Sequence, residues 1–311
     1  MLQARIAFLG TPDPAVPPLR ALAKSCGVQA VFCNPDRPQG RGRIIEPPPV
    51  KRTAIDLGLE IHQPEKWHTD ATKSLWESLK IDIALVVAYG HILPNWMIDS
   101  CKLGAWNLHF SLLPRWRGAA PVNHAILAGD TETGVSLMQI VPGLDAGPVL
   151  AQSRRPITVE STADRLLAEL AEDAAELLKA NLPNVLGGKI SLTSQDETLV
   201  TLAPKLKKEM ARLDLTKGAA ELHRQVRAFQ PWPGAEFQLD KTIIKLLKAG
   251  EVFTSDKSPG TLHWDKNSVL LSVGGSSAIE LITLQRPGKP AQPARQVMQF
   301  WGAEGSIALE V

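Results

Sequence analysis

Short apolar runs alternate with helix-like stretches through the first ninety residues of the chain. The run RIAFLG leads through the turn GTPDP into a stretch with Leu19 and Leu22 at helical spacing, and VQAVFCN follows as a second apolar run. Strand, turn, helix and strand in this order form a βαβ unit, in which the two strands are parallel. A further run, IDIALVVAYG, is almost unbroken, as in strands buried on both faces of a parallel sheet. These patterns predict an α/β fold class with a parallel sheet in the N-terminal part.

The C-terminal part has a different pattern. A chain of 311 residues exceeds a typical single domain. Beyond a polar and then basic stretch, short strand-like runs follow one another without intervening helices, which indicates a small all-β barrel, and five strands fit the oligonucleotide-binding type. We therefore expect three segments: a catalytic domain over 1–189, a basic linker over 190–208 and a barrel domain over 209–311.

The composition indicates the cellular compartment and limits the classes of binding partner. Three cysteines fit neither a disulfide framework nor a zinc site, which favours a reducing compartment. The N-terminus lacks the pattern of a secretory signal, and no stretch reaches the roughly 18 apolar residues that a membrane helix needs. We expect a cytoplasmic protein without a membrane partner. The net charge is only +2, so any affinity for nucleic acid must come from local clusters of positive charge.

One such cluster is the segment 34–52, NPDRPQGRGRIIEPPPVKR, where five basic residues outweigh two acidic ones. A solvated surface is the simpler interpretation of a charged run. Against it, the segment is long for a connection in such folds, and glycine between its arginines would let the backbone approach a phosphate chain. The charge alone leaves both interpretations open.

The stretch Leu103–Leu150 carries the candidate chemistry. Asn107 and His109 are two residues apart in a strand-like run, so their side chains share one face. A second apolar run, GVSLMQIV, ends in the turn that holds Asp145. We expect these two runs to be parallel strands that deliver an amide, an imidazole and a carboxylate to one edge of the sheet, where open α/β sheets bind ligands.

An amide, an imidazole and a carboxylate together suit acyl transfer without a covalent nucleophile. The imidazole and the amide could stabilise an oxyanion, and the carboxylate could take the proton of an attacking amine. Each residue also has a structural alternative: a core histidine, a strand-end asparagine, a turn-forming aspartate. Ser111 is a candidate nucleophile, but the GxSxG motif is absent, and no spacing around His91 or His124 supports a metal site.

Seven motifs in order along nearly the whole chain resemble those of the methionyl-tRNA formyltransferases, within the folate-dependent formyltransferases: GTPDP, NPDRPQGRGR, VVAYGHILP, NLHFSLLPRWRGAAPVNHAILAGD, TGVSLMQIVPGLDAGPVL, QDETLVTLAPKL and QPWPGA. The resemblance implies a Rossmann-like N-terminal domain and a C-terminal barrel of the oligonucleotide-binding type. It also implies formyl transfer from 10-formyltetrahydrofolate, as co-substrate, to the amino group of initiator methionyl-tRNA. No metal is expected, and a monomer is the default expectation.

The resemblance assigns roles to particular residues. Asn107, His109 and Asp145 fall on the catalytic triad of the wider family. Its folate-contacting positions fall on three segments: Tyr89, Gly90, His91, Ile92 and Leu93; Ser111, Leu112, Leu113 and Pro114; and Pro142, Gly143 and Leu144. Its tRNA-contacting positions fall on Arg37, Arg41 and Arg43 in the basic loop and on Lys205, Lys207 and Lys208 in the linker.

The sequence departs from the family pattern in places. Phe110 stands where the family usually has glycine, PAVPP replaces an aromatic start of the first helix, and LQRPGKPAQPA is unusually rich in proline. Rival functions are a folate-dependent enzyme acting on a small molecule such as a nucleotide sugar, and a non-catalytic RNA-binding protein. A nicotinamide-dependent oxidoreductase is disfavoured because the GxGxxG fingerprint is missing.

Overall fold

The computed structural model describes residues 4–39 and 44–309. The chain forms two compact units, and each combines segments that are distant in sequence. The N-terminal unit comprises Met1–Pro121, Glu132–Pro156 and Leu167–Ala203, and the C-terminal unit comprises Val122–Thr131, Ile157–Leu166 and Pro204–Val311. In the described ranges, every helix is too short or too polar to cross a bilayer.

The N-terminal unit is built on a seven-stranded sheet of order β10-β9-β7-β6-β1-β2-β5. Its five strands from β7 to β5 are mutually parallel, which confirms the predicted α/β class. The strands are β1 (Ile6–Gly10), β2 (Ala30–Phe32), β5 (Ile61–His62), β6 (Ile83–Val87), β7 (Ala105–His109), β9 (Glu132–Gln139) and β10 (Val149–Pro156).

The expectation that β9 runs parallel to β7 is wrong. The two strands are antiparallel, with Asn107 opposite Met138 and His109 opposite Ser136, and β10 returns antiparallel to β9. An apolar run does not reveal its direction, because a strand with both faces covered has the same composition in either orientation. The chain leaves β7 and enters β9 at the same edge of the sheet.

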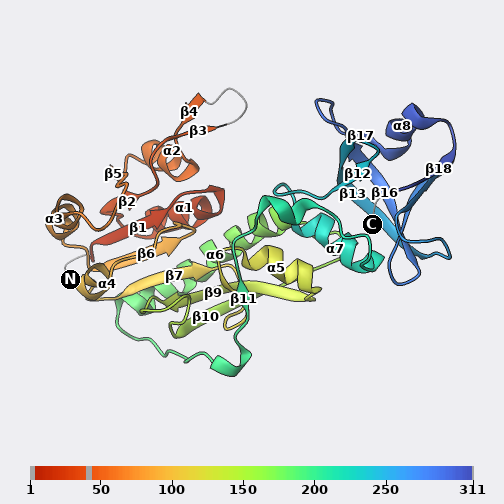
Figure 1. Ribbon diagram of the computed structural model, residues 1–311. Helices are drawn as coiled ribbons and strands as arrows, with labels where there is room; N and C mark the ends of the chain where they lie inside the picture. The colour runs from red at the N-terminus through yellow and green to blue at the C-terminus, as the bar shows by residue number, and fades with distance from the viewer. Residues whose placement is uncertain (1–3, 40–43, 310–311) are drawn as a thin grey trace. The chain divides into compact units, whose positions relative to one another are not determined.

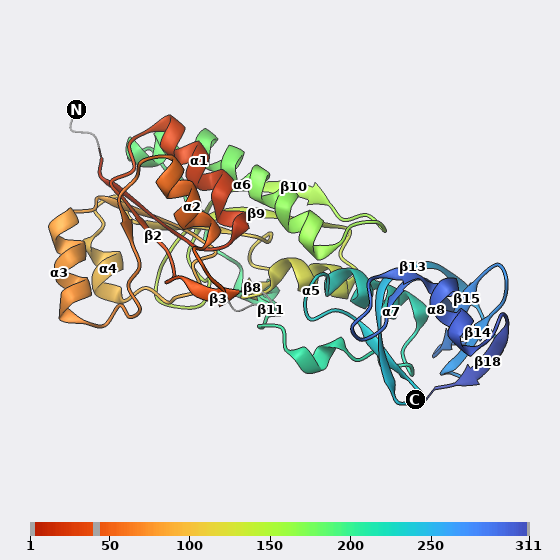
Figure 2. The ribbon, with the colours of Figure 1, turned by 90° about the horizontal axis from the view of Figure 1, so that it is seen from above.

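Helices cover both faces of this sheet. On one face, α3 and α4 contribute Trp76 and Met97 to a buried cluster that also holds Trp67 and Tyr89. On the other face, α1 and α6 run side by side (Figure 2). The proline pair of the PAVPP departure occupies the first turn of α1, where the lost N–H donors have no helical partner in any case. The helices are α1 (Val16–Ser25), α2 (Pro49–Asp56), α3 (Asp70–Leu79), α4 (Asn95–Ser100), α5 (Pro121–Ala128) and α6 (Ala163–Leu186).

Smaller elements complete the N-terminal unit. The basic segment 34–52 contains strands β3 (Arg37–Gln39) and β4 (Ile44–Glu46) and the start of α2. Further along, β8 (Arg117–Gly118) pairs with β11 (Leu202–Ala203) in parallel.

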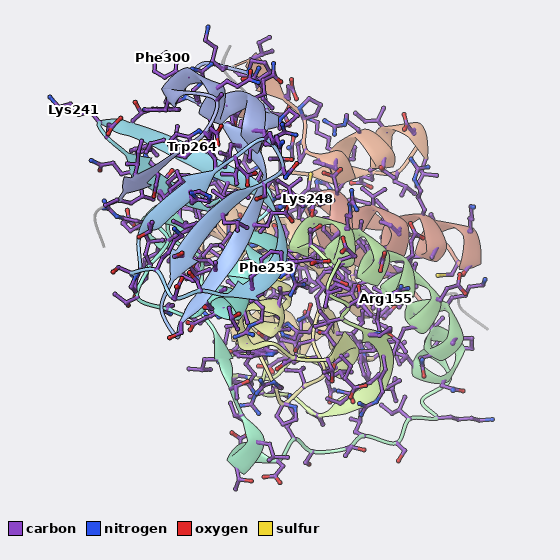
Figure 3. All side chains as sticks on the ribbon, turned by 90° about the vertical axis from the view of Figure 1, so that its right-hand side faces the viewer. Arg155, Lys241, Lys248, Phe253, Trp264 and Phe300 are labelled. Carbon is purple, nitrogen blue, oxygen red and sulfur yellow. The ribbon has the colours of Figure 1, made fainter. Side chains whose placement is uncertain are left out.

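The C-terminal unit is an antiparallel half-barrel sheet of order β12-β13-β16-β15-β14-β18, with β17 paired to β16 (Figure 1). Leu222 and Val226 of α7 join its buried cluster, together with Trp264, which Figure 3 labels within the sheet. The five predicted strands are present, and the short strands β17 and β18 were not predicted. The elements are α7 (Ala219–Ala228), β12 (Glu236–Leu239), β13 (Thr242–Thr254), β14 (Thr261–Trp264), β15 (Val269–Val273), β16 (Ser277–Gln285), β17 (Gln292–Pro293), α8 (Ala294–Met298) and β18 (Gly305–Ala308).

Candidate active site

His109 is the last residue of β7 and is only 6% exposed. Its Nε2 lies 2.9 Å from the main-chain oxygen of Trp116. A carbonyl oxygen only accepts hydrogen bonds, so this contact places the ring proton on Nε2 and directs Nδ1 the other way. Trp116 has a φ of +65°, an uncommon conformation for a residue with a side chain. Asn107, two residues earlier, is partly buried on the same face of the strand.

Asp145 reaches His109 by a route that the sequence did not predict. Because β9 is antiparallel, the carboxylate is not at the end of a neighbouring parallel strand. The loop after β9 turns back instead, and Asp145 Oδ2 lies 3.7 Å from His109 Nδ1. The same oxygen accepts a hydrogen bond of 2.9 Å from the amide of Gly118. The carboxylate and the imidazole therefore meet at the carboxyl end of β7.

Gly147 allows this loop to return so close to β9. A Cβ atom at this position would lie 1.7 Å from the main-chain oxygen of Gln139. We expect Gly147→Ala to lower the free energy of unfolding by about 2–3 kcal/mol, because the backbone must shift to relieve the overlap. Gly188→Ala is the control for adding a methyl group, since its Cβ would meet nothing within 4 Å and only the positive φ opposes it. Equal denaturation midpoints for the two variants would contradict this expectation.

The turn after β6 holds the first group of predicted folate contacts. Tyr89 is 2% exposed, and its hydroxyl accepts a hydrogen bond from Trp67 Nε1, so its side chain belongs to the core. His91 Nε2 lies 2.6 Å from Asn34 Oδ1, and burial, together with the charge of Arg37, lowers the pKa of His91. The surface of this turn is formed by Gly90, which is exposed, and Ile92, which is 90% exposed. Leu93 is buried.

The second group, Ser111–Pro114, is held in place from several sides. Ser111 is fully buried, and its hydroxyl donates to the main-chain oxygen of Arg115 at 2.6 Å. Ser136 Oγ donates to the oxygen of Ser111 and accepts from the amide of Leu113. These bonds favour a structural role for Ser111 over that of a nucleophile. Phe110 is also buried, at 7% exposure.

The third group lies in the loop that carries Asp145. Pro142, Gly143 and Leu144 are all exposed, and Leu144 is exposed to 60%. Leu144 and the exposed Ile92 of the β6 turn are apolar side chains, so a ligand that covered them would be stabilised by the burial of apolar surface.

The predicted tRNA contacts have different outcomes. Arg41 and Arg43 lie outside the described residues. Arg37 is exposed, and Lys205, Lys207 and Lys208 are exposed in the C-terminal unit. Lys51, counted in the basic cluster from sequence, is bound by Asp36 at 2.7 Å and by Gln63 at 2.8 Å, so its charge is neutralised locally.

The histidines considered as metal ligands have other partners. His124 Nε2 is 3.0 Å from the main-chain oxygen of Pro204, and His91 is bound by Asn34. Among the residues that the structure describes, no three His, Cys, Asp or Glu side chains are grouped as a metal site would require.

Sequence reasoning missed a further set of side chains beside Asp145. Arg117, 6% exposed, donates to Gln195 and to Glu197, and Gln195 donates to the main chain of the Asp145 loop. Gln195 and Glu197 stand in the motif QDETLVTLAPKL, but this polar stretch has no periodicity, so the sequence does not show which residues they contact.

The site thus combines a carboxylate, an imidazole and an amide at the carboxyl edge of a parallel sheet. Such a set can accept a proton and stabilise a developing negative charge, which are the requirements for transferring an acyl group to an amine. The family comparisons agree with this class of chemistry. Residues 4–182 match the formyl transferase family, and residues 205–300 match the C-terminal domain of formyl transferases. The chain belongs to the formyl transferase family.

Its relatives indicate the branch of the family. The chain is 40% identical to a methionyl-tRNA formyltransferase of Listeria innocua, over 96% of each chain. It is 49% identical to a methionyl-tRNA formyltransferase of Halorhodospira halophila, over 80% of each.

Solved structures show the same fold at low sequence identity. An N-formyltransferase from Helicobacter canadensis, in complex with folinic acid and dTDP-3-aminofucose, aligns with a TM-score of 0.68 at 18% identity, over 91% of this chain and 99% of that one. HypX from Aquifex aeolicus, in complex with tetrahydrofolic acid, aligns with a TM-score of 0.62 at 20% identity, over 96% of this chain and 47% of the other.

Proposed function

We infer that this chain transfers a formyl group from 10-formyltetrahydrofolate to the amino group of initiator methionyl-tRNA, giving formylmethionyl-tRNA for translation initiation. The observation that carries this inference is the similarity to methionyl-tRNA formyltransferases at 40% identity over 96% of the chain, including the C-terminal unit. The contact between His109 and Asp145 at the sheet edge supports it independently.

The residues around the site suit a folate donor. A pterin ring is flat and largely apolar on its faces, and the exposed side chains of Ile92 and Leu144 offer apolar surface to cover it. Gly90 leaves open space on its Cβ side, so the β6 turn presents bare backbone to a ring that carries hydrogen-bonding groups. We propose that these two loops hold the donor.

Asp145 is the proposed proton acceptor. The methionyl amine has a reference pKa of about 8, so at neutral pH much of it carries a proton that must be lost before attack. The neutral amine nitrogen then bonds to the formyl carbon, and the bond from that carbon to the folate nitrogen breaks as the folate nitrogen takes up a proton and leaves in tetrahydrofolate. The proton that the amine loses passes toward Asp145, which can return it to the folate nitrogen. His109 Nδ1, 3.7 Å from the carboxylate, can share this proton.

Asn107 and His109 are the residues proposed to stabilise the formyl oxygen as it gains negative charge. In the structure the Nε2 proton of His109 is directed at the Trp116 oxygen. The Asn107 amide therefore has the more direct part in this step, and His109 contributes chiefly through its positive charge when Nδ1 is protonated.

A small amine such as a nucleotide-linked amino sugar is the rival acceptor. The purified protein should be given the formyl donor and either initiator methionyl-tRNA or a dTDP-amino sugar at equal concentration. We expect formylation of the tRNA-bound amine alone. Transfer to the sugar, with none to the tRNA, would assign the chain to the rival branch of the family.

Electrostatic contacts to tRNA predict a steep dependence on salt. Removing three phosphate-binding lysines should reduce the slope of log KM for tRNA against log salt by about 2–3, since each phosphate contact contributes about 0.9. The test compares Lys205→Ala/Lys207→Ala/Lys208→Ala with Lys241→Ala/Lys257→Ala/Lys266→Ala, a triple variant with the same change of charge at other exposed positions of the C-terminal unit. If both triple variants keep the wild-type slope, Lys205, Lys207 and Lys208 do not contact tRNA phosphates.

We further propose that the enzyme works in the cytoplasm, where its tRNA substrate is used, and as a monomer. Sedimentation equilibrium tests the monomer: one mass near 33.7 kDa is expected across protein concentrations.

A further inference from the structure

The segment Thr193–Ala203, which we call the strap, is bonded to the candidate active site. Its first residue forms a main-chain bridge with Val149, and its last two residues form strand β11 beside β8. Between them, Thr201 Oγ1 accepts from the amide of Trp116 and the oxygen of Thr201 accepts from the amide of Arg117, both at 2.9 Å. The strap therefore holds the backbone whose carbonyl binds His109.

Gln195 connects the strap to the Asp145 loop. Its Nε2 donates to the main-chain oxygens of Asp145 at 2.8 Å and of Gly147 at 2.7 Å. Its Oε1 accepts from Arg117 Nε at 3.0 Å. One partly buried amide thus fastens both sides of the short turn that carries the carboxylate.

Arg117 fixes the orientation of that amide. A guanidinium has only donors, so the oxygen of Gln195 must face it and the nitrogen must face the two carbonyls. Glu197 in turn holds the guanidinium, with Oε1 and Oε2 at 2.7 Å and 3.1 Å from its two terminal nitrogens. The orientation of the Gln195 amide is therefore fixed, because the guanidinium can only donate hydrogen bonds and the main-chain oxygens can only accept them.

The Asp145 turn needs such support. Asp145 has a φ of +47°, an uncommon conformation whose cost must be offset by the surroundings. Without the two bonds from Gln195, the turn can relax toward an ordinary conformation and carry the carboxylate away from His109.

We propose that Gln195 is a positioning residue for formyl transfer, which it serves by holding the Asp145 carboxylate against His109. The proposal rests on the catalytic role of Asp145 given above. The hydrogen bonds of Gln195 go to the Asp145 loop and to Arg117, so we expect its effect on the reaction to pass through Asp145.

A double-mutant cycle tests this route. Gln195→Ala should lower kcat roughly 10- to 100-fold, the scale expected when a reacting group is misplaced by about 1 Å, and leave KM for tRNA within about twofold. In the Asp145→Asn background the same substitution should cause no further loss of kcat. A role confined to folding would reduce kcat by the same factor in both backgrounds.

The matched control is Gln225→Ala, because Gln225 Nε2 also donates to two main-chain oxygens, those of Met210 and Arg212, in the C-terminal unit. It should keep wild-type kcat and show a similar change in melting temperature. Gln195→Glu is the second variant: it keeps the acceptor for Arg117, replaces the donor by an acceptor, and should lose kcat like Gln195→Ala.

Two results would overturn the proposal: Gln195 variants with kcat within twofold of wild type, or losses that multiply with that of Asp145→Asn. A wild-type protein that does not formylate methionyl-tRNA would instead refute the proposed function, so the two failures are distinguishable.

Discussion

Asp145→Asn should lower kcat by about 10³-fold and leave the fold intact, within the range that a positioned acid–base group contributes. The asparagine side chain has nearly the same shape, and its Oδ1 can still accept the 2.9 Å hydrogen bond from Gly118. An amide cannot take the amine's proton, however, and it cannot stabilise a charged imidazole. Single-turnover formylation of charged initiator tRNA measures the effect.

Asp99→Asn is the control for this substitution, because Asp99 is an exposed aspartate of α4 in the same unit. It should keep wild-type kcat. Both variants should melt within a few degrees of the wild type. Turnover by Asp145→Asn at near the wild-type rate would remove Asp145 from the mechanism.

His109→Gln should lower kcat by about 10²-fold or more with little loss of stability. The glutamine amide can reach the position of the imidazole Nε2 and donate to the oxygen of Trp116, but it has no atom that can carry a proton toward Asp145. His109→Ala should lose the same activity and, in addition, about 1–3 kcal/mol of stability, because the hydrogen bond to the Trp116 oxygen is lost and the buried imidazole leaves a cavity.

His124→Gln is the matched control, since His124 Nε2 also faces a main-chain oxygen, that of Pro204. It should retain wild-type kcat. His109 does not have the proposed role if His109→Gln keeps more than half of the wild-type kcat, or if this variant loses as much stability as His109→Ala.

Most strands could be predicted from the sequence, but the direction of β9 could not. The runs that form β1, β2 and β6 are apolar throughout, the run that forms β7 is apolar apart from Asn107 and His109, and helical stretches separate them, which is the pattern of a parallel sheet. The run that forms β9 is largely buried as well, and only the hydrogen-bond register with β7 shows that it is antiparallel. In the C-terminal unit, β18 was missed because a four-residue edge strand has little pattern of its own.

The candidate site could be predicted in part. The spacing of Asn107 and His109 fixes their common face, because side chains alternate along a strand. We expected Asp145 to lie close to His109 because β9 was predicted to be parallel to β7. In the structure β9 is antiparallel, and the loop after β9 turns back to bring Asp145 to His109. This return of the loop depends on Gly147. The contacts of Gln195 could not be predicted from the sequence, since its partners lie 48 and 50 residues earlier in the chain.

The most direct test of the central claim is to incubate the purified protein with initiator methionyl-tRNA and 10-formyltetrahydrofolate, release the amino acid from the tRNA, and identify it by mass spectrometry. We expect formylmethionine from the wild type and almost none from Asp145→Asn in the same time. Unmodified methionine from the wild type, under conditions in which its tRNA stays charged, would contradict the account.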